Sequence, residues 1–265
     1  MYDSFNRRIT YLRISVTDKC NLRCRYCMPE EGVPIRRHEE YLSFEQITAV
    51  VRSAVRLGMT KVRLTGGEPL VKRGIVELVG MIRGVQGLRQ LTMSTNGTLL
   101  TRYAGALKAA GLDSLNISLD TLDPERYRRI TRVGDIRHVL AGIDAAVAEG
   151  FPVKINTVVL EDTSEAEIEQ MRRFCSGKGA KLQLINHYDL KLEKSDEYRY
   201  DRPPRCGECN RIRLLADGIL KPCLHSDQEI PVDFDDIEGS LLETVARKPA
   251  RGTACTVRGM MEIGG

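Results

Sequence analysis

Three cysteines lie close together near the N-terminal end of the chain, in the spacing C-x3-C-x2-C. They are Cys20, Cys24 and Cys27, and they follow the segment 11–16, whose alternating apolar and polar residues are typical of a strand. Thiolates grouped on one loop can bind one metal centre. An iron–sulfur cube usually takes four cysteines, so this group alone would leave one iron open to a small molecule. A zinc knuckle and three unrelated buried cysteines remain alternatives, although zinc sites prefer C-x2-C pairs and a closed set of four ligands.

A second group of three cysteines occurs near the other end of the chain, in the spacing C-x2-C-x13-C. Its members are Cys206, Cys209 and Cys223. Between them, segments 212–215 and 219–220 are typical of a small β-hairpin. This group can hold a second metal centre, or it can form a zinc ribbon that His225 or Cys255 completes.

Composition narrows the class of protein. The 265 residues are 42% hydrophobic and 29% charged, which allows one sizeable core with an appendage. The net charge of +4 is mild and does not indicate a nucleic-acid partner, whereas a cationic pocket for an anionic small molecule fits it equally well. Because six of the eight cysteines fall in two tight groups, metal binding in a reducing cytosol is favoured over a disulfide framework. The N-terminal residues lack the apolar core of a signal peptide, and no apolar run approaches the ~20 residues of a membrane span. We therefore expect a cytoplasmic protein without a membrane partner.

Strand-like and helix-like segments alternate along the first two thirds of the chain. Strands are expected at 11–16, 61–65, 88–94, 114–119, 153–160 and 181–185, and helices at 43–57, 75–82, 99–110, 124–130, 136–149 and 165–175. This alternation indicates parallel βα units, and six units are too few for a closed eight-stranded barrel. We predict an α/β fold in which an open, partial (β/α)6 TIM-type barrel spans 1–185. A linker over 186–205 and a small C-terminal iron–sulfur region over 206–265 would follow.

One face of nearly every expected strand is polar, because residues at i and i+2 point the same way. That face carries Arg13, Ser15, Lys61, Arg63, Thr65, Thr92, Ser94, Asn116, Ser118, Asp120, Lys154, Asn156, Lys181 and Gln183. The opposite face is apolar and carries Leu12, Ile14, Val16, Val62, Leu64, Leu115, Ile117, Leu119, Ile155, Leu182 and Leu184. A parallel sheet buried on both sides would be apolar throughout. We therefore predict that the polar face lines the lumen of the barrel and holds an anionic ligand. An antiparallel sheet with one solvated face is the alternative, and the intervening helices argue against it.

The first cysteine group resembles the radical S-adenosylmethionine (SAM) superfamily, in which C-x3-C-x-Tyr-C follows a first strand. The fuller string 12–29 is similar to the branch formed by the GTP 3′,8-cyclases of molybdenum-cofactor biosynthesis. The resemblance implies that Cys20, Cys24 and Cys27 hold a 4Fe–4S cluster whose open iron binds SAM. It implies further SAM contacts from Tyr26, Gly66, Gly67, Glu68, Ser94, Asn96 and Ser118. Strand-end capping is the alternative role for the last three.

The second cysteine group and its flanks, 209–214 and 221–224, resemble the same family. The resemblance implies a second 4Fe–4S cluster on Cys206, Cys209 and Cys223, with its open iron on the guanine base. It also implies that a set of basic residues binds the triphosphate, with surface salt bridges as the alternative. These residues are Arg13, Lys61, Arg63, Arg211 and Arg213. Gly264-Gly265 matches the family's tail, which enters the active site, and we expect Cys255 to be a buried thiol rather than a fourth ligand.

The implied activity is radical chemistry on GTP. An electron from a low-potential donor cleaves SAM to methionine and a 5′-deoxyadenosyl radical, which takes hydrogen from C3′ of GTP. Closure of C3′ onto C8 gives 3′,8-cyclo-7,8-dihydro-GTP. The first step needs no general base, so none of the four histidines is assigned a catalytic role. A homodimer is left open.

Two other functions stay open. The chain lacks a block before Cys206 and has Gln183 where the family has an arginine. It is therefore also interpretable as a shortened relative that acts on a peptide or another cofactor precursor. The second alternative is a non-enzymatic iron–sulfur or zinc protein.

Overall fold

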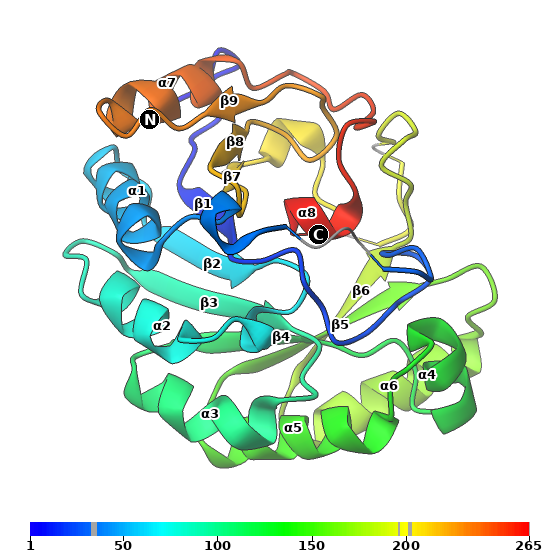
Figure 1. Cartoon of the computed structure of the whole chain (residues 1–265). Coiled ribbons are helices and arrows are strands. Elements are labelled where there is room, and N and C mark those ends of the chain that lie inside the picture. The colour runs from blue at the N-terminus through cyan, green and yellow to red at the C-terminus, as the bar shows by residue number, and fades with distance from the viewer. Residues whose placement is uncertain (33–35, 196, 201–202, 265) are drawn as a thin grey trace.

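The computed structural model describes residues 1–32, 36–195, 197–200 and 203–264 (Figure 1). Within them one sheet has the strand order β6-β5-β4-β3-β2-β1-β7-β8-β9. The strands are β1 (Tyr11–Ser15), β2 (Lys61–Thr65), β3 (Gln90–Thr95), β4 (Ser114–Ser118), β5 (Val153–Val159), β6 (Lys181–Asn186), β7 (Arg211–Leu214), β8 (Ile219–Lys221) and β9 (Ile230–Pro231). The helices are α1 (Phe44–Arg56), α2 (Ile75–Arg83), α3 (Leu100–Ala109), α4 (Pro124–Thr131), α5 (Ile136–Ala148), α6 (Glu165–Gly177), α7 (Ile237–Ala246) and α8 (Met260–Ile263).

Strands β1 to β6 are parallel and pair in chain order, with helices packed on their outer side (Figure 1). The open, partial barrel is therefore confirmed, and the element ends differ from the expected ones by at most about two residues. Local signals explain the starts of two helices. Ser43 and Gln46 form a capping box at α1, and Ser164 and Glu167 form one at α6.

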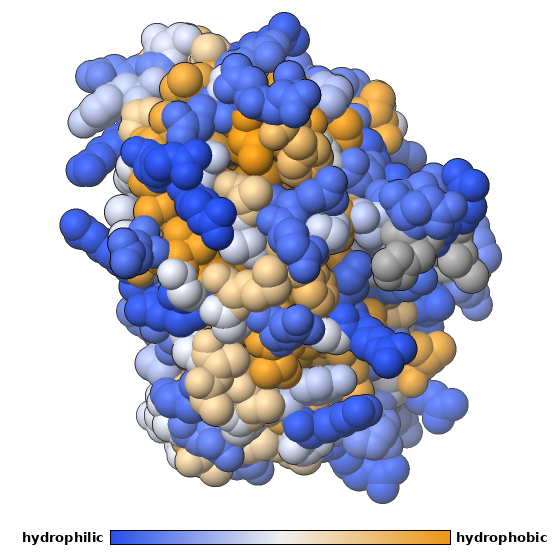
Figure 2. Space-filling view, turned by 60° about the vertical axis from the view of Figure 1, so that its left-hand side comes forward, coloured by the Kyte–Doolittle hydropathy of each residue, from blue (hydrophilic) through white to orange (hydrophobic). Residues whose placement is uncertain are grey.

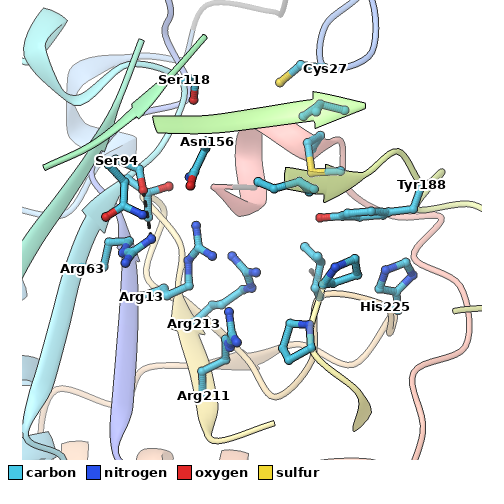
Figure 3. Close-up of a pocket in the computed structure, with 18 of the residues that line it drawn as sticks. Arg13, Cys27, Arg63, Ser94, Ser118, Asn156, Tyr188, Arg211, Arg213 and His225 are labelled. Carbon is cyan, nitrogen blue, oxygen red and sulfur yellow. Dashed lines mark hydrogen bonds between the residues drawn. The ribbon is translucent and has the colours of Figure 1, made fainter. Parts of the chain in front are cut away.

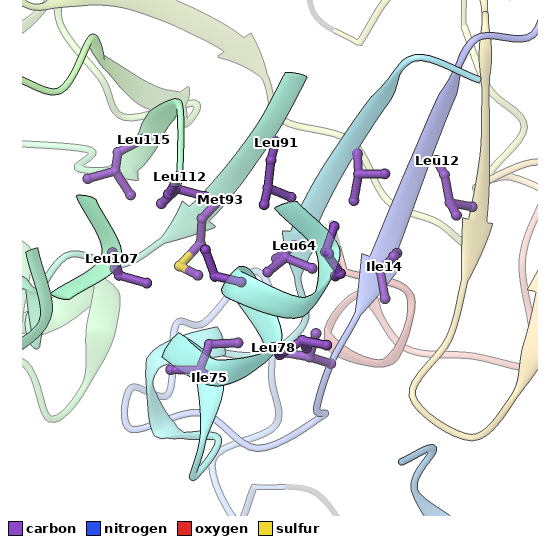
Figure 4. Close-up of a cluster of buried hydrophobic side chains, with 14 of the residues drawn as sticks. Leu12, Ile14, Leu64, Ile75, Leu78, Leu91, Met93, Leu107, Leu112 and Leu115 are labelled. Atoms are coloured by element: carbon purple, nitrogen blue, oxygen red, sulfur yellow. The ribbon is translucent and has the colours of Figure 1, made fainter. Parts of the chain in front are cut away.

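The apolar strand face packs against the helices to form the core. Leu12, Ile14 and Leu64 are fully buried there and meet Leu78 and Leu91 (Figure 4). Leu182 and Leu184 are only half-buried, because β6 lies at the edge of the sheet. On the face shown in Figure 2, hydrophilic side chains project outward and apolar ones lie between them. Among the described residues, no helix has the length and apolar character needed to cross a membrane.

The C-terminal region is joined to the barrel. β7 pairs in parallel with β1, so the hairpin that the sequence predicts continues the barrel sheet past its first strand. The sequence did not predict β9, α7 or α8. Asn186 is the last residue of β6, and the described residues of 187–205 contain no helix or strand. Leu190 and Lys194 are nevertheless buried, and Leu190 packs with Leu215 and Ile263, so this segment covers the C-terminal region.

Candidate active site

A cavity of about 370 Å³ lies inside the open barrel (Figure 3). Its lining brings both cysteine groups together with much of the polar strand face. The strand residues concerned are Arg13, Lys61, Arg63, Thr65, Ser94, Asn116, Ser118, Lys154, Asn156 and Gln183. The prediction that the polar face lines the lumen is thus confirmed for most positions. The exceptions are Ser15, Thr92 and Asp120, which are buried against protein, and Lys181, which is exposed.

The first cysteine group forms a half-buried turn directly after β1. The backbone N–H groups of Cys27 and Met28 both donate to the Cys24 carbonyl at 2.9 Å, which folds the loop back on itself. All three thiols line the cavity. Burial and the neighbouring Cys20 raise the pKa of Cys27 to about 12, and burial also raises the pKa of Cys24. Bound iron would supply the positive charge that three thiolates need here.

Two glycines after β2 allow the cysteine loop to pack tightly. Gly66 has a φ of +140°, and a Cβ on it would lie 2.3 Å from the Thr17 oxygen. A Cβ on Gly67 would lie 2.4 Å from the Lys19 oxygen. Any side chain at either position would push the cysteine loop away, so glycine is required for this close approach. Both glycines also line the cavity.

Glu68, by contrast, is fully buried and does not line the cavity as a SAM contact would. One carboxylate oxygen accepts from the Leu70 N–H at 2.9 Å and the Thr95 hydroxyl at 2.8 Å, and the other accepts from the Asn96 N–H at 2.6 Å. Glu68 therefore braces the ends of β2 and β3 against each other. A direct contact with SAM stays a prediction.

Burial raises the pKa of Glu68 from its ordinary value of 4.5 to about 7. The folded chain then holds this proton more tightly than the unfolded chain, so Glu68 lowers the free energy of unfolding progressively as pH rises from about 4.5 to about 7. We expect Glu68→Gln, in protein without cofactors, to remove this part of the decline in urea-unfolding measurements. Asp120, whose pKa burial raises to about 6, keeps its own contribution in both proteins. A difference between the two curves that does not change with pH would contradict the prediction.

The other residues assigned to SAM lie at the cavity wall: Tyr26, Ser94, Asn96 and Ser118. The Tyr26 hydroxyl donates to Asp120 at 2.7 Å, which ties the cysteine loop to the end of β4. Ser118 points into the cavity (Figure 3), whereas the Ser94 hydroxyl accepts from Arg63 at 3.4 Å. The structure places these side chains together, and their contact with SAM is a prediction.

Five cations from the adjacent strands β1, β2 and β7 line the cavity: Arg13, Lys61, Arg63, Arg211 and Arg213. Strand β1 lies between β2 and β7, and the register sets Arg13 beside both Arg63 and Arg213 (Figure 3). Burial and the like charge of Arg213 lower the pKa of Arg13. Guanidinium groups held this close repel one another, so an anionic ligand would stabilise the arrangement.

The Tyr11 ring packs against three of these cations, although the sequence did not predict a role for it. Its ring centre lies 5.1 Å from Lys61 Nζ, and the Arg63 and Arg211 guanidinium carbons lie at 5.7 and 5.5 Å. Burial opposes ionisation of the hydroxyl, but the surrounding cations outweigh it and lower the pKa of Tyr11. The sequence could have indicated this position, because Tyr11 shares the strand face of Arg13.

The second cysteine group lies on the same cavity, around the short 3-10 helix Cys206–Glu208 and the end of β8. Buried Lys248 donates to the Arg211 and Pro222 carbonyls at 2.9 and 2.7 Å. Although burial opposes it, the charges of Lys248 and Arg211 lower the pKa of Cys209 to about 7. A thiolate that forms readily suits a metal ligand.

Cys255 and His225, the two candidates for a further metal ligand in the second group, differ in their surroundings. Cys255 is fully buried among apolar residues and is not part of the cavity lining, which supports the buried-thiol interpretation. His225 lines the cavity, 5.2 Å from the Tyr188 ring (Figure 3), and neither ring nitrogen has a hydrogen-bond partner among the described residues. Burial lowers the pKa of His225 to about 4, so the ring is neutral.

The zinc alternative requires ligands that converge on one ion. Among the described residues, no three His, Cys, Asp or Glu side chains are placed to hold a single metal ion. In a cube, each cysteine binds a different iron, so its ligands are spread around the cluster.

Comparisons with known proteins show the family of this chain. The model of the radical SAM superfamily matches residues 14–175. The chain belongs to the radical SAM superfamily, whose members bind SAM and a 4Fe–4S cluster, and it is an enzyme of that class.

Closer relatives identify the branch. The chain is 40% identical over 320 residues to the GTP 3′,8-cyclase of Alkaliphilus oremlandii (strain OhILAs), covering 100% of both proteins. It is 39% identical over 319 residues to that of Peptoclostridium acidaminophilum, covering 100% of this chain and 98% of that protein. It therefore belongs to the GTP 3′,8-cyclase family. Both alignments are longer than the 265 residues of this chain, so they include positions that it lacks.

Solved structures share the fold. Streptococcus suis SuiB bound to S-adenosylmethionine superposes with a TM-score of 0.70 at 17% identity, over 93% of this chain and 66% of that one. The structure titled native anSMEcpe with bound AdoMet gives 0.64 at 17% identity, over 90% and 81%. At this identity the likeness shows the fold alone.

Proposed function

We propose that this enzyme is a GTP 3′,8-cyclase with two 4Fe–4S clusters, acting in molybdenum-cofactor biosynthesis. One observation carries the proposal: a single cavity is lined by both three-cysteine groups and by the basic residues of β1, β2 and β7. This arrangement suits a nucleoside triphosphate that is held between a radical source and a second metal centre. We further propose a cytoplasmic enzyme that takes its electron from a low-potential donor.

The residues of this chain would bind the cofactors and orient the substrate. Cys20, Cys24 and Cys27 would hold the first cluster, and the glycine loop at 66–67 would let SAM approach its open iron. Once bound and reduced by one electron, the cluster and SAM would supply a 5′-deoxyadenosyl radical for removal of hydrogen from C3′ of GTP. The apolar and aromatic walls of the cavity would keep water from this reaction.

The second group would hold the base end of the substrate. Cys206, Cys209 and Cys223 would bind three irons of a second cluster and leave one for guanine. The lowered pKa of Cys209 supports ligation, because metal binds the thiolate. Arg211 and Arg213, on the strand between the two cysteine segments, would then reach the triphosphate.

Replacing Arg213, the most buried of the five basic residues, tests the proposed phosphate site. Arg213 is buried, so Arg213→Ala deletes a charged hydrogen-bond donor that water cannot replace. We expect GTP affinity to fall by about ten- to a hundredfold, equivalent to roughly 1.5–3 kcal/mol. Lys61→Ala should have a smaller effect, since Lys61 is half-buried. Equilibrium dialysis with the reconstituted protein measures both, and unchanged affinity in both variants would favour a different substrate.

The second candidate is a shortened relative acting on a peptide or another cofactor precursor. Gln183 supports it, because it lines the cavity and accepts from Lys154 at 3.4 Å where the family has an arginine. Anaerobic reconstitution with SAM and dithionite separates the two. GTP-dependent 5′-deoxyadenosine formation supports the cyclase, and formation that GTP does not stimulate supports the alternative.

A further inference from the structure

Outside the cavity, a network of ion pairs joins the first cysteine loop, the turn between β7 and β8, and α8. We call it the tail network, and it consists of Asp18, Arg36, Asp217, Lys221, Glu229, Arg258 and Glu262. These residues come from the first cysteine loop, the segment before α1, the hairpin of β7 and β8, the segment after β8, and the C-terminal end. The proposed reaction uses none of them directly.

Arg36 lies at the centre of this network. Its guanidinium contacts one carboxylate from each of these three parts of the chain: Asp18 at 2.9 Å, Asp217 at 3.0 Å and Glu262 at 2.7 Å. The Tyr41 hydroxyl donates to the same Asp18 carboxylate. A single planar side chain with several donors can satisfy three acceptors at once, which lysine cannot do in the same geometry. Arg36 therefore ties the first cysteine loop to both the hairpin turn and α8.

Arg258 provides a second connection to α8. It contacts Asp217 at 2.7 Å, Glu229 at 2.8 Å and Glu262 at 3.3 Å. Glu229 also lies 3.4 Å from Nζ of Lys221, whose side chain is completely buried. Paired charges that are this well covered are costly to separate. The network therefore holds α8 at a defined place.

The C-terminal tail beyond α8 reaches the cations of the cavity. The Gly264 carbonyl accepts from Arg213 at 2.7 Å and from Arg13 at 3.0 Å. Gly264 has a φ of +68°, and a Cβ on it would lie 2.5 Å from the Thr65 hydroxyl oxygen. The tail is thus fixed from outside by the network and from inside by two arginines of the proposed phosphate site.

We propose that Arg36 is a positioning residue that holds α8 against the first cysteine loop, so that Gly264 orients Arg13 and Arg213. A carbonyl is a neutral acceptor, so it fixes a guanidinium without neutralising it. Side chains that are already ordered lose less entropy when an anion binds. Loosening the tail should therefore weaken nucleotide binding although no substrate contact is removed. The identity of that nucleotide rests on the proposed function, whereas the position of the tail does not.

The test compares Arg36→Gln, Arg36→Lys and a control, Arg37→Gln, in the reconstituted enzyme. Arg37 is adjacent in sequence, its side chain is 75% exposed, and it pairs with Glu39 and Glu40 on the surface. Hydrogen exchange of the amides at 259–264 reports the tail directly. We expect exchange about tenfold faster in Arg36→Gln, an intermediate rate in Arg36→Lys and no change in Arg37→Gln. GTP affinity should fall about tenfold in Arg36→Gln, with iron content unchanged.

Glu262→Gln tests the same link from the other end. Glutamine keeps the capping box that Glu262 makes with the Gly259 N–H, but it loses the charge that faces Arg36. Glu262 is not part of the cysteine loop, so this variant still tests whether the ion pair holds the tail if Arg36→Gln loses its cluster. Unchanged exchange in both variants would overturn the proposal. Faster exchange with unchanged GTP affinity would overturn the orienting role. Failure of the unmodified enzyme to bind GTP would contradict the proposed function, while the exchange comparison would still decide whether Arg36 holds the tail.

Discussion

Replacing Cys24 by alanine should abolish SAM cleavage. Cys24 lies in the middle of the first group, and two thiolates, those of Cys20 and Cys27, are too few to hold a 4Fe–4S cluster. Among the cysteines outside the two groups, Cys175 is in α6 and Cys255 is buried in the C-terminal region, so neither is a spare ligand for this loop. We expect no 5′-deoxyadenosine above background from Cys24→Ala after anaerobic reconstitution with dithionite.

Cys175→Ala is the matched control, since it removes a buried thiol from α6 without touching the cavity. It should keep its iron content and most of its SAM cleavage, with at most a modest loss of stability from the small void. Alanine variants at Cys20 and Cys27 should behave like Cys24→Ala. If all three variants still form 5′-deoxyadenosine, the assignment of this loop is wrong.

Cys206→Ala should lose one of the two proposed clusters, whereas Cys255→Ala should keep both. Cys206 lines the cavity and accepts a hydrogen bond from the Gly252 N–H at 3.4 Å, as a ligand sulfur commonly does. The Cys255 sulfur instead packs among Leu190, Leu215 and Ile263. We therefore expect about four irons fewer per chain in Cys206→Ala and no loss in Cys255→Ala.

Iron analysis together with Mössbauer spectra of these two variants measures the effect. The comparison also distinguishes an open second cluster from a closed one. A loss of about four irons from Cys255→Ala would mean that Cys255 is a fourth ligand. The second cluster would then have no open iron for guanine, and a substrate other than GTP would be favoured.

The barrel and much of its lumen followed from the sequence, because parallel strands that alternate with helices and carry one polar face are typical of a barrel with a polar interior. Residues such as Arg13, Arg63 and Asn156 were placed on that face by the two-residue period alone, and they line the cavity. The register that sets Arg13 beside Arg213 was not predictable. It depends on β7 pairing with β1 across almost the whole chain, and local patterns carry no such information.

Two other features were not predicted from the sequence. The Glu68 carboxylate accepts hydrogen bonds from the Thr95 hydroxyl and the Asn96 N–H at the end of β3, and its expected contact with SAM stays a prediction. The tail network was missed because its charges, read along the chain, look like ordinary surface residues. Only the fold brings Arg36 within 3.0 Å of Asp18, Asp217 and Glu262.

The central claim is that one cavity joins SAM cleavage to GTP, and isotope transfer tests it most directly. The reconstituted enzyme would be supplied with SAM, dithionite and GTP deuterated at C3′. If the account is right, mass spectrometry will find deuterium in the 5′-deoxyadenosine, together with a cyclised nucleotide that retains the triphosphate. The account is contradicted if 5′-deoxyadenosine forms readily but carries no deuterium from GTP.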